Sequence, residues 1–220
     1  MGQVETALTG NNSGQDAQKQ AFSATELFHA HTLRIARHDL LVTILVLGRF
    51  IQRHRGATLA LLGGDRSFHT QIQTLQQQIN AQLEFIALLN HTAGSSIADN
   101  DWKQLSLGWL TIIKDWENDA IHHSFEFHSH LLELLLRVTR QLSESVLYQP
   151  PLPNMPETVR NRVEKTCLEP LQNLNQTCVI ELYELVEYLA RIRGMGTHMA
   201  AVGHSDNDSD TRVSFWLQEF

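Results

Sequence analysis

The chain has 220 residues, of which 42% are hydrophobic, and its 24 acidic and 17 basic side chains give a formal net charge of −7. This length and apolar content are sufficient for a buried core in one domain or in two small halves. The negative charge argues against a protein that binds nucleic acid or an anionic membrane through overall positive charge. Any anion that this protein binds must therefore meet local positive charge.

The N-terminal 22 residues are polar, rich in Gln, Asn, Gly and Ser, and lack the basic end and apolar run of a secretory signal. We expect residues 1–22 to be a disordered tail. Ser23 and Glu26 form the capping box S-x-x-E, which predicts a long helix from there to the glycine pair at 63–64. The most apolar run, 40–48, is about half of the ~18 residues that suggest a membrane span. We expect a cytoplasmic protein that does not contact a membrane.

Further helices are predicted downstream of the glycine pair. Asp65 is suited to cap a helix over about 66–90, whose apolar residues recur at steps of three and four. Residues 91–101 are predicted to form a loop, and 102–148 are predicted to carry two helices that are broken near 117–119.

A proline-rich segment, QPPLPNMPE, divides the chain into possible halves at 23–149 and 157–220. A helix is expected from about 157, bent or restarted at Pro170, with a short last helix near the C-terminus. No strand pattern is present. We predict an all-α fold in which residues 23–220 form long antiparallel helices in two packed bundles.

Two matching segments, FIQRHRG at 50–56 and YLARIRG at 188–194, indicate internal duplication. In the first helix the apolar row Ile44, Leu47, Ile51, Leu59 and Leu62 includes Arg55. In the second helix the row Leu182, Leu185, Leu189 and Ala200 includes Arg193. Arg55 and Arg193 are therefore expected to be buried.

The other arginines of these segments have simpler explanations. Arg53 lies near Arg49 on the wetter side of its helix, and Arg191 lies four residues after Glu187, which predicts an exposed ion pair.

Arg55 and Arg193 have no carboxylate one turn away, and a buried guanidinium group needs an anionic partner. One candidate partner is an acidic side chain of another helix, from the set Glu84, Asp115, Glu117, Asp119, Glu126 and Glu133. The other candidate is a small anion clamped between the two arginines, for which Gly56 and Gly194 would allow close approach.

The segments QRHRGATLALLGG and EYLARIRGMGTHMAAVG, in a helical chain of this length, resemble the NIT domain, the nitrate- and nitrite-sensing domain of bacterial receptors and transcription antiterminators. The resemblance implies two antiparallel four-helix bundles and an anion bound by arginines from an early and a late helix, here Arg55 and Arg193. The candidate ligand-binding residues are Arg55, Arg193, Gly56, Gly194, Thr58 and Thr197. His54 departs from the family, which usually has Glu at this position.

By this resemblance the chain is a non-catalytic sensor that binds nitrate or nitrite without a cofactor and signals through helix rearrangement. The family's effector modules do not fit in 220 residues, so we expect a separate effector protein. A homodimer is a possible assembly of this chain, and we expect no direct binding of nucleic acid.

A helical-bundle iron protein is the alternative. His122, Glu126 and His130 share a helix face, and Glu26-x-x-His29 has the spacing of di-iron bundles. However, no second Glu-x-x-His occurs. A third possibility is a plain helical adaptor whose arginines make internal ion pairs.

Cys167 and Cys178 are eleven residues apart, or about 16 Å along one helix, which is too far for a disulfide. We expect two buried free thiols. The sequence contains no nucleotide-binding loop or nucleophile elbow, and we expect no enzymatic activity.

Overall fold

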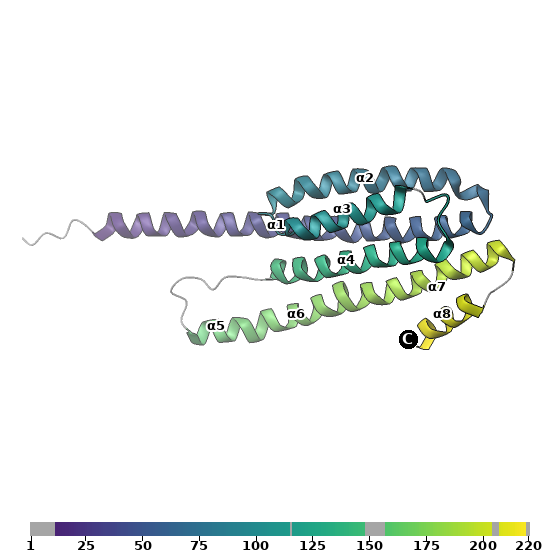
Figure 1. Ribbon diagram of the computed structural model, residues 1–220. Coiled ribbons are helices and arrows are strands. Elements are labelled where there is room, and N and C mark those ends of the chain that lie inside the picture. The colour runs from purple at the N-terminus through teal and green to yellow at the C-terminus, as the bar shows by residue number, and fades with distance from the viewer. Residues whose placement is uncertain (1–11, 115, 148–156, 204–206, 219–220) are drawn as a thin grey trace, which may run out of the picture.

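The computed structural model describes residues 12–114, 116–147, 157–203 and 207–218, and this part of the chain forms helices and turns without any strand (Figure 1). The prediction of an all-α helical bundle is confirmed. None of the helices in these ranges is long and apolar enough to cross a bilayer.

The longest element is α1 (Asn12–Leu62), whose N-terminal part extends beyond the other helices (Figure 1). The prediction of a tail that ends at residue 22 is wrong for residues 12–22, which are helical, whereas 1–11 lie outside the described residues. Residues 15–22 contain several good helix formers and neither Gly nor Pro, so the helix continues through them. Ser23 consequently lies inside the helix and not at its cap.

The predicted turn after α1 is present. Gly64 adopts φ +109°, and the Asp65 side chain accepts a hydrogen bond from the backbone N–H of Ser67 at 3.0 Å. A short 3₁₀ helix (Arg66–Phe68) then leads into α2 (His69–Thr92).

The predicted break in the middle of the chain is also present. It separates α3 (Asp99–Lys114) from α4 (Ile121–Leu147). The proline-rich segment at 148–156 lies outside the described residues.

The C-terminal part begins with one nearly continuous helix. Two π-helical segments, Glu164–Leu168 and Gln176–Glu181, join α5 (Glu157–Val163), α6 (Glu169–Asn175) and α7 (Leu182–Val202). Pro170 lies in the first turn of α6, directly after the π-helical segment Glu164–Leu168, so the chain changes from π-helix to α-helix near this proline instead of ending and restarting. After Gly203, which adopts φ +79°, the chain forms α8 (Asn207–Gln218).

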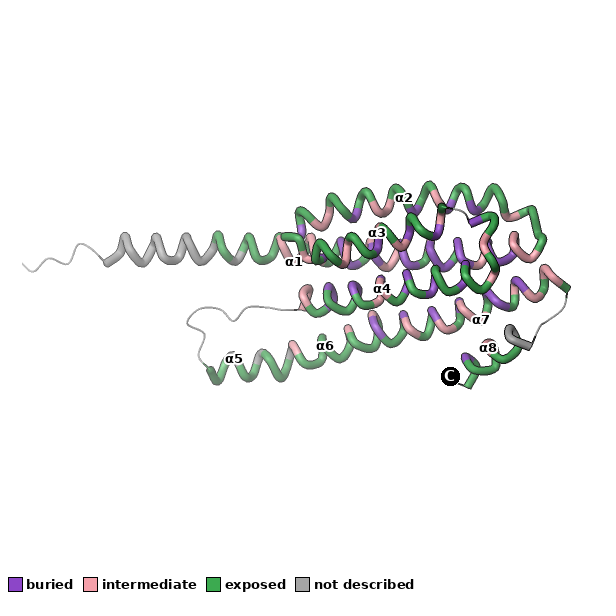
Figure 2. Tube along the Cα trace, viewed as in Figure 1, coloured by how far each residue is buried: buried purple, intermediate pink, exposed green. Residues whose placement is uncertain are grey.

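The core lies where α1 packs against α2, α4 and α7 (Figure 2). Leu40, Ile44, Leu47 and Ile51 of α1 are at most 2% exposed. α4 runs antiparallel to α1 and α7, whereas α1 and α7 run in the same direction (Figure 1). Because α7 packs on both α1 and α4, helices from the two predicted halves share contacts.

Candidate functional site

Arg55 is fully buried, as the apolar row of α1 predicts, but it has an internal acidic partner. Its Nη1 and Nη2 donate to Oε1 and Oε2 of Glu187 on α7, at 2.7 and 3.1 Å. Nη1 also donates to Ser129 Oγ on α4 at 3.1 Å, and the guanidinium group lies over the Phe125 ring. An acidic side chain of another helix therefore pairs with Arg55, as one of the two alternatives predicts, but it is Glu187 and not one of the six acids of the predicted set. Arg55 consequently does not need an external anion to neutralise its charge.

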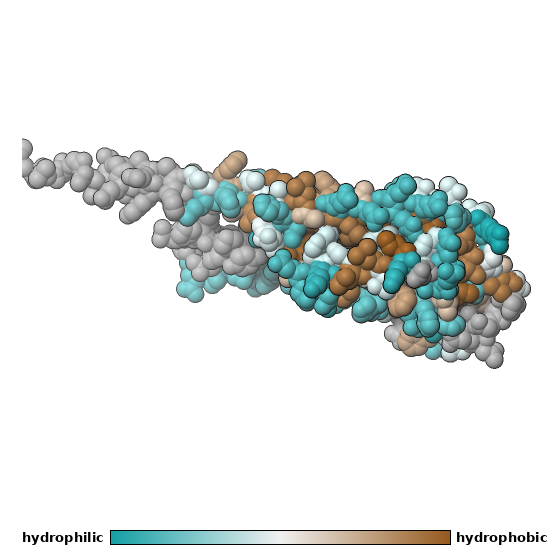
Figure 3. All heavy atoms as spheres, turned by 45° about the horizontal axis from the view of Figure 1, so that its top comes forward, coloured by the Kyte–Doolittle hydropathy of each residue, from teal (hydrophilic) through white to brown (hydrophobic). Residues whose placement is uncertain are grey.

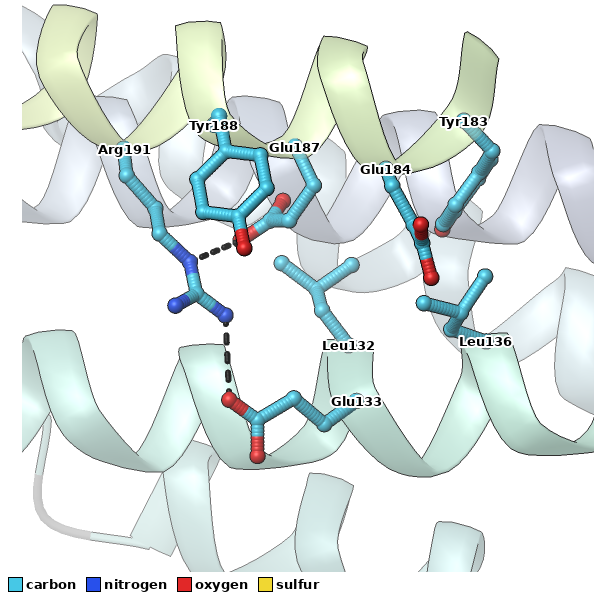
Figure 4. A pocket seen from close by; sticks show the side chains of 8 residues that line it. All are labelled: Leu132, Glu133, Leu136, Tyr183, Glu184, Glu187, Tyr188 and Arg191. Atoms are coloured by element: carbon cyan, nitrogen blue, oxygen red, sulfur yellow. Dashed lines mark hydrogen bonds and ion pairs between the residues drawn. The ribbon is translucent and has the colours of Figure 1, made fainter. Parts of the chain in front are cut away.

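Glu187 is the centre of this buried network. Besides the two hydrogen bonds from Arg55, its carboxylate accepts Gln52 Nε2 at 2.9 Å and Arg191 Nε at 2.9 Å. Arg191 also reaches Glu133 of α4 at 3.1 Å (Figure 4). The i, i+4 pair of Glu187 and Arg191 is present as predicted, but Glu187 is 7% exposed and not on an open face.

Burial and charge act against each other in this network. Burial lowers the pKa of Arg55, while the carboxylate of Glu187 opposes that change by its charge and hydrogen bonds. For Arg191 burial also lowers the pKa, but hydrogen bonds and charge from Glu187 and Glu133 outweigh it, so the net direction is upward. Both guanidinium groups remain cationic, and α1, α4 and α7 are tied together by charge-assisted hydrogen bonds.

Next to Arg55, His54 and His128 form a buried pair. His128 Nδ1 lies 2.6 Å from the carbonyl oxygen of Ser124, so it carries a proton, and its Nε2 accepts from His54 Nδ1 at 2.8 Å. Burial lowers the pKa of His54 to about 4. Burial, together with His54 and Arg55, also lowers the pKa of His128. Both rings are neutral at pH 7, so His54 adds no charge to the site.

The predicted burial of Arg193 is wrong. Arg193 is exposed, and so are Leu182, Leu185 and Leu189 of its row. The opposite face of α7 is buried instead, through Tyr183, Glu187, Ala190, Gly194, Met195 and His198. Small residues on that face allow α7 to lie close to α1: a Cβ at Gly194 would be 3.2 Å from Leu59 Cδ1.

Arg193 instead lines a surface groove between α1 and α7, with a volume of about 460 Å³. We call this the arginine groove, and its lining residues are Arg49, Gln52, Arg53, Val186, Leu189, Ala190 and Arg193. Arg49, Arg53 and Arg193 are exposed, and no ion-pair partner is found for them in the described part of the chain. Among the described residues, no carboxylate lines the groove. Arg55 is not one of its lining residues, so the structure does not bring Arg55 and Arg193 to one site.

The remaining predicted site residues, two glycines and two threonines, do not line the arginine groove. A Cβ at Gly56 would meet nothing within 4 Å, so this glycine does not mark a close approach. Gly194 does mark one, but the group that comes close to it is a side chain of α1. Thr58 is fully buried near His54 Nδ1, at 3.5 Å, and Thr197 Oγ1 donates to the carbonyl oxygen of Arg193 at 2.8 Å. Neither threonine lines the arginine groove.

A second hollow, of about 200 Å³, lies between α4 and α7 (Figure 4). Its polar lining consists of Glu133, Tyr183, Glu184, Glu187, Tyr188 and Arg191. All three carboxylates are already bonded to arginines: Glu133 and Glu187 to Arg191, and Glu184 to Arg140. This α4/α7 cleft therefore offers no free charge for a ligand.

The residues of the alternative iron site do not converge. No group of three or more His, Cys, Asp or Glu side chains that could hold a metal ion occurs in the part of the chain that is described. His122, Glu126 and His130 are exposed, and Glu126 pairs with Arg212 of α8 at 3.2 Å. Cys178 is exposed, contrary to expectation, and the side chain of Cys167 lies outside the described residues.

Sequence reasoning missed Glu187, Gln52 and Ser129 as partners of Arg55, because hydrogen bonds between residues 74 to 135 positions apart leave no periodic pattern. It also set aside Arg49 and Arg53 as solvated. The spacing of four between these two arginines shows that they share a face, but only the packing of α7 beside them forms a groove.

Comparisons with protein families, with curated proteins and with solved structures find no match to this chain. The resemblance to the NIT domain therefore remains a hypothesis that depends on the two arginine motifs.

Proposed function

We propose that this chain is a sensor domain that binds a small oxyanion, nitrate or nitrite, in the arginine groove, and that it signals to a separate effector. The observation that carries the proposal is that three exposed guanidinium groups, from Arg49, Arg53 and Arg193, line one groove that contains no carboxylate. Unlike Arg55, these groups have no internal acid to neutralise them among the described residues. Of the two arginines that the resemblance to the NIT domain implies as anion ligands, the proposal keeps Arg193. Arg49 and Arg53 take the place of Arg55.

Guanidinium groups suit this ligand class because their planar N–H donors match the oxygens of a planar oxyanion. Two or three charge-assisted hydrogen bonds, at about 1.5–3 kcal/mol each, must offset the loss of freedom on binding and the screening of an exposed groove. The hydrogen bonds sum to roughly 3–9 kcal/mol before these costs, so we expect weak binding, with a dissociation constant in the millimolar range.

The groove also offers a route for a signal. It is formed by α1 and α7, which come from opposite ends of the chain, and an anion shared between them favours the packing that brings their arginines together. Gln52 links the groove to the interior, because it lines the groove and donates to Glu187. A change in the position of Gln52 would thus reach the network that joins α1, α4 and α7.

Thermal unfolding at constant ionic strength tests the proposal, with nitrate or nitrite compared with chloride and sulfate. A ligand at 100 times its Kd adds about 2.7 kcal/mol of stability, or roughly 5–10 °C for a chain of this size. We expect this shift with nitrate or nitrite and its loss in Arg193→Gln and Arg53→Gln. Arg66→Gln is the matched control, since it removes one exposed arginine outside the groove. The proposal is wrong if neither anion raises the Tm, or if the control removes the shift as fully as Arg193→Gln.

A further inference from the structure

A row of large apolar side chains lies exposed along α6 and α7. The leucines of this row are between 40% and 59% exposed, and Cys178, in the middle of the row, is exposed as well. Successive members are three or four residues apart, and the π-helical segment Gln176–Glu181 interrupts the α-helical period between Leu174 and Leu182. The row is therefore a strip of exposed side chains and not a regular heptad seam. We call it the leucine row, and its members are Leu171, Leu174, Cys178, Leu182, Leu185 and Leu189.

A second exposed row approaches the same surface from α1. Phe28, Ile35 and Val42 are spaced by seven residues and are 73%, 49% and 45% exposed. The next step of seven reaches Arg49, which lines the arginine groove together with Leu189 of the leucine row. The row on α1 thus ends two turns before the groove, whereas the leucine row on the adjacent α7 reaches it at Leu189. Exposed apolar side chains gathered in this way indicate a protein interface.

Charges at the two ends of the leucine row indicate what covers it. Arg193 follows Leu189 by four residues on α7, and Glu164 begins the π-helical segment that precedes α6 at the other end of the row; both are exposed. The midpoint between these two charges falls between Cys178 and Val179, close to the middle of the row, which spans residues 171–189. A second copy of the same row, laid antiparallel, therefore places the glutamate of each copy opposite the arginine of the other. Such self-complementarity is what a two-fold symmetric interface requires.

We propose that two copies of this chain form an antiparallel dimer through the leucine row, with Arg193 of each copy facing Glu164 of the other. The apolar row of α1 extends the same interface. If the proposed anion site is correct, a bound anion and the Glu164 carboxylate compete for Arg193, so the ligand weakens the dimer. The dimer itself does not depend on that site, and its test contains no nitrate or nitrite.

The molar mass of the full chain, measured by light scattering or sedimentation at tens of micromolar, tests the proposal. We expect twice the chain mass of 25.0 kDa for the unaltered protein and the single chain mass for Leu182→Glu/Leu189→Glu. Leu88→Glu/Leu107→Glu is the matched control, because these leucines are similarly exposed, at 63% and 53%, on α2 and α3. Apolar side chains are also visible on that other surface (Figure 3). A monomeric unaltered protein, or equal dissociation by the control pair, would overturn the proposal.

Two further variants test the antiparallel arrangement. Arg193→Glu and Glu164→Arg should each weaken the dimer about tenfold or more, and the double variant should restore it. In a Cys167→Ser chain, a short bis-maleimide should link two copies through Cys178, because this residue lies near the proposed symmetry axis. Failure of the double variant to restore the dimer, or a dimer in which Cys178 does not cross-link, would exclude this interface.

Discussion

Removing the two partners of the buried ion pair should have unequal effects on stability. In Glu187→Gln, Arg55 stays charged and 0% exposed, its anionic partner is replaced by a neutral amide, and its described hydrogen bond to Ser129 Oγ is retained. Leaving a buried charge without its partner costs about 3–5 kcal/mol. In Arg55→Met, by contrast, the carboxylate keeps its hydrogen bonds from Gln52 and Arg191. We expect this second change to cost about 1–2 kcal/mol, the typical value for the loss of hydrogen bonds and for altered packing.

Urea unfolding followed by circular dichroism measures both values, provided that the transitions remain two-state. For Glu187→Gln the expected loss corresponds to a fall in Tm of roughly 6–20 °C. The double variant Arg55→Met/Glu187→Met should be more stable than Glu187→Gln alone, because neither charge remains without a partner. The account of the buried network is wrong if Arg55→Met is more destabilising than Glu187→Gln, or if both lie within about 0.5 kcal/mol of the unaltered protein.

The other predictions concern protonation and the contact between helices. The pKa of His54 is about 4 in the folded protein, below its ordinary 6.5, so the stability that the neutral ring contributes is complete above pH 6.5 and is lost as the pH falls towards 4. Urea unfolding at several pH values should show about 3 kcal/mol of this loss between pH 7 and 4, and a smaller loss in His54→Asn. Gly48→Ala should lower the Tm, because its Cβ would clash with the Tyr183 hydroxyl, and Tyr183→Phe should reduce that effect. The buried Tyr183 hydroxyl has no hydrogen-bond partner among the described residues, so Tyr183→Phe alone should not lower the Tm. Gly56→Ala should raise stability by about 0.5–1 kcal/mol, and Gly194→Ala should gain less, because its Cβ would lie 3.2 Å from a buried leucine. Equal Tm changes at the two glycines would contradict the close approach of α7 to α1.

The amino-acid sequence by itself determined the helical fold, the turn at Gly64, the break between α3 and α4, and the burial of Arg55. These features are local: they follow from capping residues, glycines and a row of bulky apolar side chains on α1, and neighbours along the chain decide them. The early start of α1 is the local feature that the pattern misplaced, because a capping motif at Ser23 does not prevent an already helical segment from continuing.

Only the tertiary structure decided which face of α7 is buried. Apolar periodicity selects Leu182, Leu185 and Leu189, yet α7 turns its glycine, alanine and glutamate towards α1. Small side chains let the two helices approach closely, and Glu187 neutralises a guanidinium group that comes from 132 positions earlier in the chain. A pairing over that separation depends on how three helices pack, which the spacing of residues within one helix does not encode. The same choice of face exposes Arg193, and so it forms both the arginine groove and the leucine row.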